Sequence, residues 1–193
     1  MNRAQVDAFR QDITLSTDVR GVPLSLHSTW GLFSPRELDD GSRLLLEHIE
    51  VHPQDDCLDL GCGYGPIGLT LARLAPQGQT LMVDKDFVAV DYAARNARLN
   101  RIDNAQALLS NGFSAVGNRQ FDLIVSNIPA KVGKEMLYIF LYDALDRLKP
   151  GGRLYFVSIN GLREFFKRTM NEVFGNYEKV KQGKDYTVSL ARR

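Results

Sequence analysis

This chain of 193 residues has little of several features that define other classes of protein. It contains only two cysteines, Cys57 and Cys62, and one tryptophan. Both cysteines lie in or beside one predicted strand, which indicates free thiols in a reducing compartment and argues against a disulfide framework. The N-terminus is polar, with Asn2, Arg3 and Gln5, and has no apolar run that would predict a signal peptide or membrane span. We therefore expect a cytoplasmic protein.

Net charge is also nearly absent. The formal net charge is +1, which excludes a strong overall field for polyanions. Basic residues nevertheless outnumber acidic ones in residues 161–193, and both nucleic-acid contact and a solvated face would explain this bias. The basic residues there are Arg163, Lys167, Arg168, Lys179, Lys181, Lys184, Arg192 and Arg193.

Metal-binding patterns are scarce too. His48 and His52 have the spacing of metal ligands on one helix face, but Pro53 follows and no further ligand accompanies them. We interpret them as ordinary histidines and predict no metal site.

What the sequence does contain is a regular alternation of apolar strands and amphipathic helices. The segment 134–148 has the apolar period of a helix, and Tyr177–Lys181 with Tyr186–Leu190 indicates a terminal hairpin. Such alternation predicts a doubly wound parallel sheet with helices on both faces. The expected strands are 57–60, 79–83, 105–109, 121–126 and 153–158, and the expected helices are 66–75, 87–99, 134–148 and 161–174.

The first 30 residues are polar and irregular. Short strands are expected at 11–15 and 22–26. We interpret residues 1–30 as an extension packed on a domain of residues 31–193.

A helix is predicted to begin directly after this extension. Ser34 is the expected N-cap, Pro35 takes the first turn, and Glu37 completes a capping box. The helix is expected to end before Pro53.

The most informative stretch runs from Asp59 to Gly68, where a buried strand meets a helix through closely spaced glycines. Glycine permits a sharp turn and lets a ligand lie against bare backbone. The N-terminus of the following helix directs its free N–H groups at such a ligand. Taken alone, Gly63, Gly65 and Gly68 also fit the dinucleotide-binding fingerprint, so the glycines leave the ligand open.

Two further strands end in polar residues. Asp84 follows Gly61 by 23 residues, where a doubly wound fold places the carboxylate that binds ribose hydroxyls. Asn127, Ile128 and Pro129 follow the strand 121–126. Ligands bind at the carboxyl ends of parallel strands, so we expect these motifs to meet at one site.

The three motifs, in this order, resemble class I S-adenosylmethionine-dependent methyltransferases. With Gly31–Ser34 and Leu38–Leu46 ahead of them, the set is similar to the small-domain family typified by the ribosomal RNA small-subunit guanine-N2 methyltransferases. The match covers about residues 30–193, as in single-domain members. It implies a Rossmann-like α/β fold whose seven-stranded sheet is mainly parallel with an antiparallel last strand. It also implies S-adenosyl-L-methionine as cofactor and RNA, with ribosomal RNA as the first candidate, as partner of a monomer or homodimer, with no membrane and no metal.

The resemblance assigns roles to individual residues. Asp59 and the glycine turn would hold the methionine part of the cofactor, Asp84 the ribose, and Lys85 the adenine. Asn127 would lie beside the transferring methyl group. The implied cofactor-binding set is Asp59, Gly61, Cys62, Gly63, Tyr64, Gly65, Asp84, Lys85, Asn111, Gly112 and Asn127, and the implied catalytic set is Asn127, Ile128 and Pro129.

The catalytic motif departs from the family's usual Asn-Pro-Pro-aromatic at Ile128 and Ala130. The missing aromatic removes a stacking platform worth ~1–3 kcal/mol per base. The side-chain oxygen of Asn127 and the carbonyl of Ile128 are expected to accept the two N–H groups of an exocyclic amine. We therefore predict methyl transfer to an amine nitrogen, with guanine N2 of ribosomal RNA as the first candidate.

Alternatives stay open. The same cofactor would also serve a methyltransferase of a small molecule or protein side chain, or a non-catalytic ribosome-associated factor that binds S-adenosylmethionine. Asp59 has a structural alternative as a cap of the glycine turn, Asp84 as a cap of the next helix, and Asn127 as part of a strand-end turn. Trp30 and Tyr64 fit base stacking and packing in the core or a lid equally well.

Overall fold

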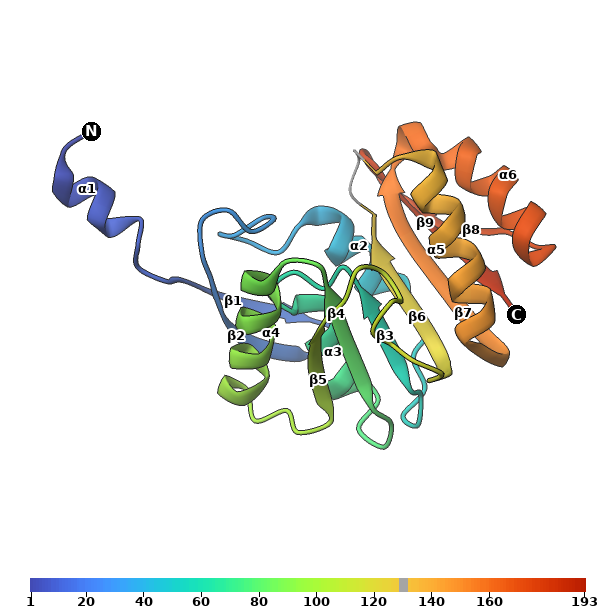
Figure 1. Ribbon diagram of the computed structural model, residues 1–193, viewed down its shortest axis with the longest axis horizontal. Helices are drawn as coiled ribbons and strands as arrows, with labels where there is room; N and C mark the ends of the chain where they lie inside the picture. Colours follow the sequence, from blue (N-terminus) through green and yellow to red (C-terminus); the bar gives the residue numbers. More distant parts are fainter. Residues whose placement is uncertain (129–131) are drawn as a thin grey trace.

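The computed structural model describes residues 1–128 and 132–193, so Pro129 lies outside the described residues. In that part of the chain, seven strands form a central sheet and two more form a separate hairpin (Figure 1). The strands of the central sheet are β3 (Cys57–Leu60), β4 (Thr80–Asp84), β5 (Ala105–Leu109), β6 (Phe121–Asn127), β7 (Leu148–Ile159), β8 (Glu178–Gln182) and β9 (Tyr186–Arg192).

The strand order is β5-β4-β3-β6-β7-β9-β8. Strands β3 to β7 pair in parallel, and β9, the last strand, is antiparallel to both of its neighbours. This confirms the predicted Rossmann-like sheet with an antiparallel last strand. The direction of winding reverses between β3 and β6, and doubly wound folds bind their ligands at the carboxyl ends of the strands beside such a reversal.

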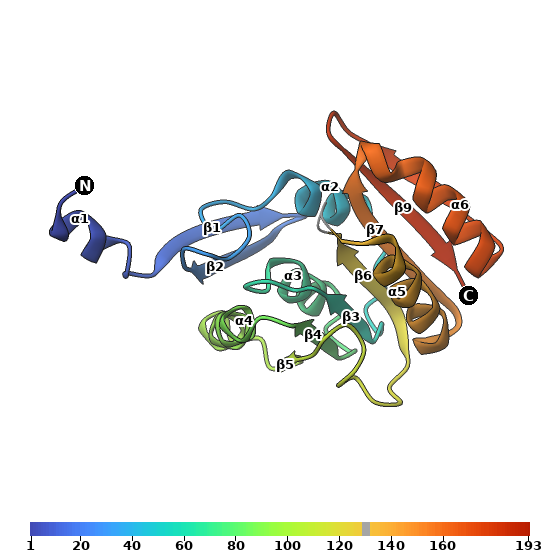
Figure 2. The same cartoon turned by 45° about the horizontal axis from the view of Figure 1, so that its top comes forward.

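Helices cover both faces of the sheet (Figure 2). On one face, α2 and α3 bury Leu45 and Leu71 against Val125 of β6. On the other face, α5 and α6 pack against the preceding residue of β6, Ile124, because successive side chains of a strand point to opposite faces. The helices are α2 (Asp40–His48), α3 (Pro66–Leu74), α4 (Phe87–Leu99), α5 (Lys134–Arg147) and α6 (Arg163–Phe174), and the 3-10 helix η1 (Asn160–Leu162) precedes α6.

The N-terminal segment forms α1 (Arg3–Ala8) and a hairpin of β1 (Ile13–Val19) and β2 (Val22–Ser28). The hairpin packs on α3 and α4, where Leu24 and Leu26 are buried in one apolar cluster with Ala93. Helix α1 was not expected from the sequence. It buries none of its residues and lies apart from the sheet (Figure 1).

The predicted helix start at Ser34 was wrong. Helix α2 begins at Asp40, and Asp39 is its N-cap because its carboxylate accepts a hydrogen bond from the Ser42 N–H. Ser34 has a φ of 43° and its hydroxyl donates to the carbonyl of Glu37, so this segment is a turn. The helix therefore begins after the N-cap at Asp39, whose carboxylate also contacts Asn127 and Tyr186, and the capping pattern at Ser34 is not used.

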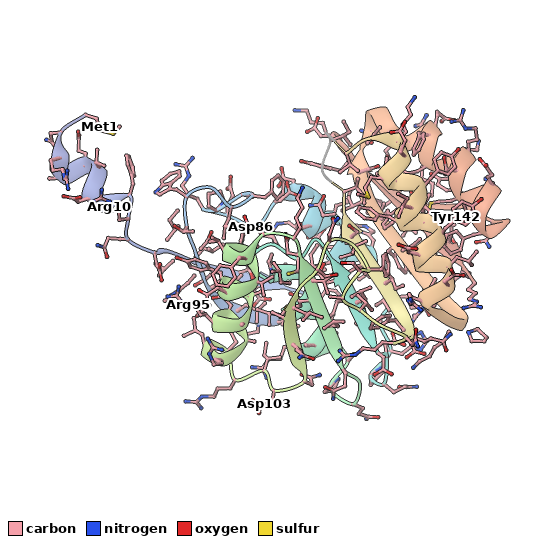
Figure 3. All side chains as sticks on the ribbon, in the orientation of Figure 1. Met1, Arg10, Asp86, Arg95, Asp103 and Tyr142 are labelled. Atoms are coloured by element: carbon pink, nitrogen blue, oxygen red, sulfur yellow. The ribbon has the colours of Figure 1, made fainter. Side chains whose placement is uncertain are left out.

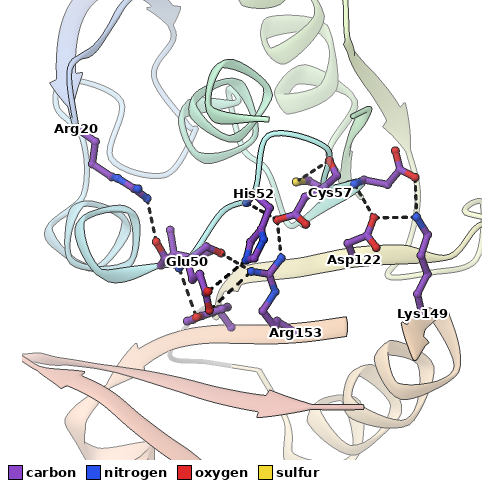
Figure 4. A network of polar contacts seen from close by, with 11 residues as sticks. Arg20, Glu50, His52, Cys57, Asp122, Lys149 and Arg153 are labelled. Carbon is purple, nitrogen blue, oxygen red and sulfur yellow. Dashed lines mark hydrogen bonds and ion pairs between the residues drawn. The ribbon is translucent and has the colours of Figure 1, made fainter. Parts of the chain in front are cut away.

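The amino-terminal edge of the sheet carries a network of ion pairs (Figure 4). Arg153 of β7 pairs with Asp55, and their side chains are 7% and 6% exposed. Nearby, the Lys149 ammonium lies 2.8 Å from carboxylate oxygens of both Asp56 and Asp122. These hydrogen bonds raise the pKa of Lys149. The charged groups of this network pair with one another.

Candidate active site

The glycine turn after β3 presents bare backbone to open space. Gly61 and Gly63 have φ angles of 78° and 54°, which side-chain-bearing residues rarely adopt. A Cβ atom added at either position would meet no other atom within 4 Å. The Gly61 N–H donates to the Val83 carbonyl over 2.8 Å, which fastens the turn to β4. A ligand can therefore lie directly against this backbone.

Asp59 lies beneath the turn and is fully buried. Its Oδ2 accepts a hydrogen bond of 2.7 Å from the Gly68 N–H at the start of α3. Its Oδ1 is buried without a hydrogen-bond partner among the described residues. Burial raises the pKa of Asp59 to about 7, and the nearby Asp84 carboxylate adds to this shift. Such an atom is a ready acceptor for a positively charged ligand.

Asp84 joins the end of β4 to the glycine turn. Its Oδ2 accepts from the Gly63 N–H and its Oδ1 from the Asp86 N–H, each over 2.9 Å. The N-cap of α4 is Asp86, which accepts from the Val88 N–H, so Asp84 does not cap that helix. Asp84 is half-buried and Lys85 is exposed beside it. Figure 3 shows Asp86 at this edge of the sheet, away from Asp103 at the opposite edge.

The side chains of Cys62 and Tyr64 are buried in the core, so only their backbone lines the turn. The Tyr64 hydroxyl donates to the carbonyls of Ser34 and Glu37 at 3.1 and 3.2 Å. Burial raises the pKa of Tyr64 to about 12. The ring anchors the segment before α2 and is not available for base stacking.

Asn111 and Gly112 follow β5, close to Asp84. The Ser110 N–H donates to the Asp84 carbonyl over 2.8 Å, and the Ser110 hydroxyl donates to the Gly112 carbonyl. Asn111 is exposed. Asn111 and Gly112, which the family resemblance assigns to the adenine side of the cofactor, therefore lie beside Asp84, the predicted ribose-binding residue.

Asn127 ends β6 on the other side of β3. The Ser126 hydroxyl donates to the Leu60 carbonyl over 2.7 Å, which links the ends of the two strands directly ahead of Asn127 and Gly61. Ile128 is buried and its N–H donates to the Val157 carbonyl over 3.0 Å. The structure thus brings together the predicted residues that it describes at one edge of the sheet.

Sequence reasoning missed the residues that contact the Asn127 side chain. Its amide nitrogen donates to Asp39 Oδ2 over 2.8 Å and to Ser42 Oγ over 2.9 Å. The Tyr186 hydroxyl of β9 donates to Asp39 Oδ1 over 3.2 Å. Asp39 and Ser42 were visible only within the resembled segment Leu38–Leu46, and no local signal points to Tyr186.

The C-terminal basic residues do not gather at one place. The turn between β8 and β9 contains Lys184, whose carbonyl accepts from Asn160 next to the carboxyl end of β7. Arg192 and Arg193 end β9 at the opposite edge, where Arg193 donates to the Leu148 carbonyl. Only part of this basic set can contact a substrate at the candidate active site.

Residues 1–128 and 132–193 show neither a candidate metal site nor a candidate membrane-spanning helix. No group of three or more His, Cys, Asp or Glu side chains there could hold a metal ion. No helix of the described residues is both long and apolar enough to cross a membrane. His48 contacts the Leu44 carbonyl and His52 contacts Glu50.

Comparison with known proteins agrees with this geometry. The family model described as "Methyltransferase small domain" matches residues 23–189. The chain belongs to this family. It is 33% identical to the uncharacterised protein YbxB of Bacillus subtilis, with 93% of this chain and 91% of YbxB covered.

Relatives with assigned activities are longer. The ribosomal RNA small subunit methyltransferase C of Pseudomonas syringae is 35% identical over 91% of this chain and 53% of that protein. A solved structure of the Thermus thermophilus 16S rRNA N2 methyltransferase RsmC, in complex with AdoMet and guanosine, has a TM-score of 0.85 and 30% identity. It covers 94% of this chain and 50% of that one. The chain thus spans about half the length of these relatives.

Proposed function

We propose that this protein transfers a methyl group from S-adenosylmethionine to an exocyclic amine nitrogen, with guanine N2 of ribosomal RNA as the substrate. The observation that carries the proposal is the position of Asn127, which ends β6 one strand away from the open glycine turn. The 30–35% identity to small-subunit rRNA methyltransferases supports the choice of substrate. For a protein with this substrate we expect a cytoplasmic location.

The residues present fit S-adenosylmethionine. The buried Oδ1 of Asp59 offers a negative acceptor to a cationic ligand, and the open backbone at Gly61 and Gly63 admits close approach. Asp84 is placed to accept hydrogen bonds from ribose hydroxyls. When bound, the cofactor supplies a methyl group activated by a positively charged sulfur. Residues 31–193 form the methyltransferase domain of this proposal, and residues 1–30 its extension.

The chain's own contribution is to position the acceptor. The Oδ1 of Asn127 and the carbonyl of Ile128 accept the two N–H groups of the target amine. This draws its lone pair out of conjugation and stabilises the developing positive charge. Alignment of reacting groups is worth up to ~7–11 kcal/mol in model reactions. No strong base is needed, since the methylated amine is acidic enough to lose its proton to water.

The test uses methyl-labelled S-adenosylmethionine and an extract from cells that lack the protein, separated into RNA, protein and small molecules. The expected result is label in the RNA fraction alone, and none with Asn127→Ala. Label in the protein or small-molecule fraction would replace RNA with that substrate class. Binding of the cofactor without label in any fraction would favour the non-catalytic factor.

A further inference from the structure

Asp39 is tied to the candidate active site by a contact for which the proposed function gives no reason. Its Oδ2 accepts two hydrogen bonds, one of 3.0 Å from the Ser42 N–H and one of 2.8 Å from the Asn127 side-chain amide. The first hydrogen bond makes Asp39 the N-cap residue of α2, and this cap does not need the second hydrogen bond. The contact to Asn127 joins residues 88 positions apart in the sequence.

Both hydrogens of the Asn127 side-chain amide are used in hydrogen bonds to neighbouring residues. An amide NH₂ has two hydrogens, and they point to Asp39 Oδ2 and to Ser42 Oγ. A rotation of the amide by half a turn would place its oxygen against the Asp39 carboxylate, where two acceptors repel. Asp39 therefore decides which atom of the Asn127 amide faces away from α2.

We propose that Asp39 is a positioning residue that fixes the Asn127 amide with its oxygen toward the acceptor amine. This inference rests on the proposed function. A target amine presents hydrogen-bond donors, so only the oxygen of Asn127 can bind it productively. The χ2 angle of asparagine is soft, and without Asp39 the reversed amide would place donors against donors. Ser42 stabilises the same orientation from the first turn of α2.

Two further residues hold Asp39 in place. The Tyr186 hydroxyl donates to Asp39 Oδ1 and thereby keeps Oδ2 turned toward Asn127. Gly41 leaves the room that this arrangement needs. A Cβ atom at Gly41 would lie 2.9 Å from Asp39 Oδ2 and 2.9 Å from Tyr186 Cδ1. The glycine in the Asp39–Ser42 segment thus follows from the close approach of these two side chains.

The experiment separates the cap from the positioning role with two substitutions. In Asp39→Ser, the serine hydroxyl still caps α2 but is too short to reach Asn127. We expect kcat on RNA to fall at least about tenfold, while the KM for RNA and the Kd for S-adenosylmethionine stay within about twofold. Asp39→Asn keeps an oxygen toward Asn127 and the Ser42 N–H, so it should restore at least about a third of the rate. The neighbouring, exposed Asp40 gives the matched control Asp40→Ser, with wild-type kcat.

A double-mutant cycle tests whether Asp39 acts through Asn127. Asp39→Ser should lower the rate of Asn127→Ala no further, because the group that it positions is already gone. An independent loss in that background, or equal losses of kcat, cofactor affinity and stability in the single variant, would overturn the inference.

An NMR measurement keeps the inference testable apart from the proposed function. The side-chain NH₂ signals of Asn127 should stay at hydrogen-bonded shifts in Asp39→Asn. In Asp39→Ser, the signal of the hydrogen that faces Asp39 should move toward a free-amide shift, whereas the hydrogen that Ser42 binds keeps its partner. Unchanged signals in Asp39→Ser would contradict the positioning role. A wild-type protein that methylates no RNA would instead contradict the proposed function, whatever the NMR signals show.

Discussion

The two ends of strand β3 carry buried aspartates with opposite surroundings. Asp55, just before the strand, pairs with the buried Arg153 and also accepts from the His52 N–H. Asp59, within the strand and next to the glycine turn, accepts only from the Gly68 N–H and keeps an unpartnered oxygen among the described residues. The carboxylate of Asp55 thus has its partners within the fold, whereas that of Asp59 keeps one oxygen that we propose a ligand binds.

This contrast extends along both edges of the sheet. The amino-terminal edge neutralises its charges internally, as Lys149 does with Asp56 and Asp122 (Figure 4). The carboxyl-terminal edge combines open glycine backbone with the raised pKa of Asp59 and the oriented amide of Asn127. We propose that the amino-terminal edge serves stability and the carboxyl-terminal edge serves ligand binding and chemistry.

The largest expected effect is on stability. Asp55→Ala leaves the buried Arg153 with only the more distant Glu50 carboxylate, 3.9 Å away, and should lower the free energy of unfolding by ~3–5 kcal/mol. Urea denaturation measures this loss, and cofactor affinity of the folded protein should not change. Asp56→Ala is the control, because the pair of Asp56 with Lys149 is far more accessible to solvent, with side chains 39% and 35% exposed, and is worth only ~0–1 kcal/mol. Equal losses in both variants would contradict the contrast between buried and exposed pairs.

Asn127→Ala should show the reverse pattern. Loss of an acceptor used mainly in the transition state should lower the single-turnover rate by ~10²–10³. The affinity for S-adenosylmethionine should stay within a few-fold, since Asn127 faces the acceptor more than the cofactor. A variant that keeps more than about a tenth of the rate would show that Asn127 is structural.

Asp84→Ala should weaken binding of S-adenosylmethionine at least about tenfold in calorimetry. Each charge-assisted hydrogen bond to the ribose is worth ~1.5–3 kcal/mol. Asp86→Ala removes the N-cap of α4, two residues away from Asp84. It should lower the free energy of unfolding by ~1 kcal/mol without weakening the binding of the cofactor. Wild-type affinity in Asp84→Ala would disprove the ribose assignment.

Burial raises the pKa of Asp59 to about 7, so both the stability of the protein and its affinity for the cofactor should depend on pH. Since the folded-state pKa lies above the unfolded one, this group's contribution to stability is present below about pH 4 and is lost as the pH rises through about 7. A cationic ligand prefers the ionised form, so cofactor affinity should fall below pH 7 by up to about tenfold per pH unit. Calorimetry across this range measures the slope, and Asp59→Asn should flatten it. The same slope in that variant would assign it to another group.

The smallest expected effect concerns the basic residues. Lys184→Glu, at the carboxyl-terminal edge, should raise the KM for RNA a few-fold. The slope of log affinity against log salt concentration should fall by about one, which corresponds to one counterion fewer released on binding. Arg192→Glu, at the opposite edge, should change neither quantity. Similar changes in both variants would show that RNA binds across the whole C-terminal region.

Much of this arrangement could be predicted from local patterns. Periodicity located the helices and strands of the sheet, and Asp59, Asp84 and Asn127 meet because the carboxyl ends of parallel strands share one edge. The start of α2 was misplaced because Ser34 and Asp39 both offer a local N-cap, and the structure uses Asp39. The contacts of Asp39 with Asn127 and Tyr186, 88 and 147 residues away, could not be predicted. Such contacts between residues far apart in the sequence cannot be recognised from the pattern of a single helical turn.

The destination of the methyl group tests the central claim most directly. Wild-type protein and Asn127→Ala are incubated with methyl-labelled S-adenosylmethionine and ribosomal RNA from cells that lack the protein, and the RNA is digested to nucleosides for mass spectrometry. We expect label in N2-methylguanosine with the wild type and almost none with Asn127→Ala. Label in a different nucleoside, or equal label from both proteins, would contradict it.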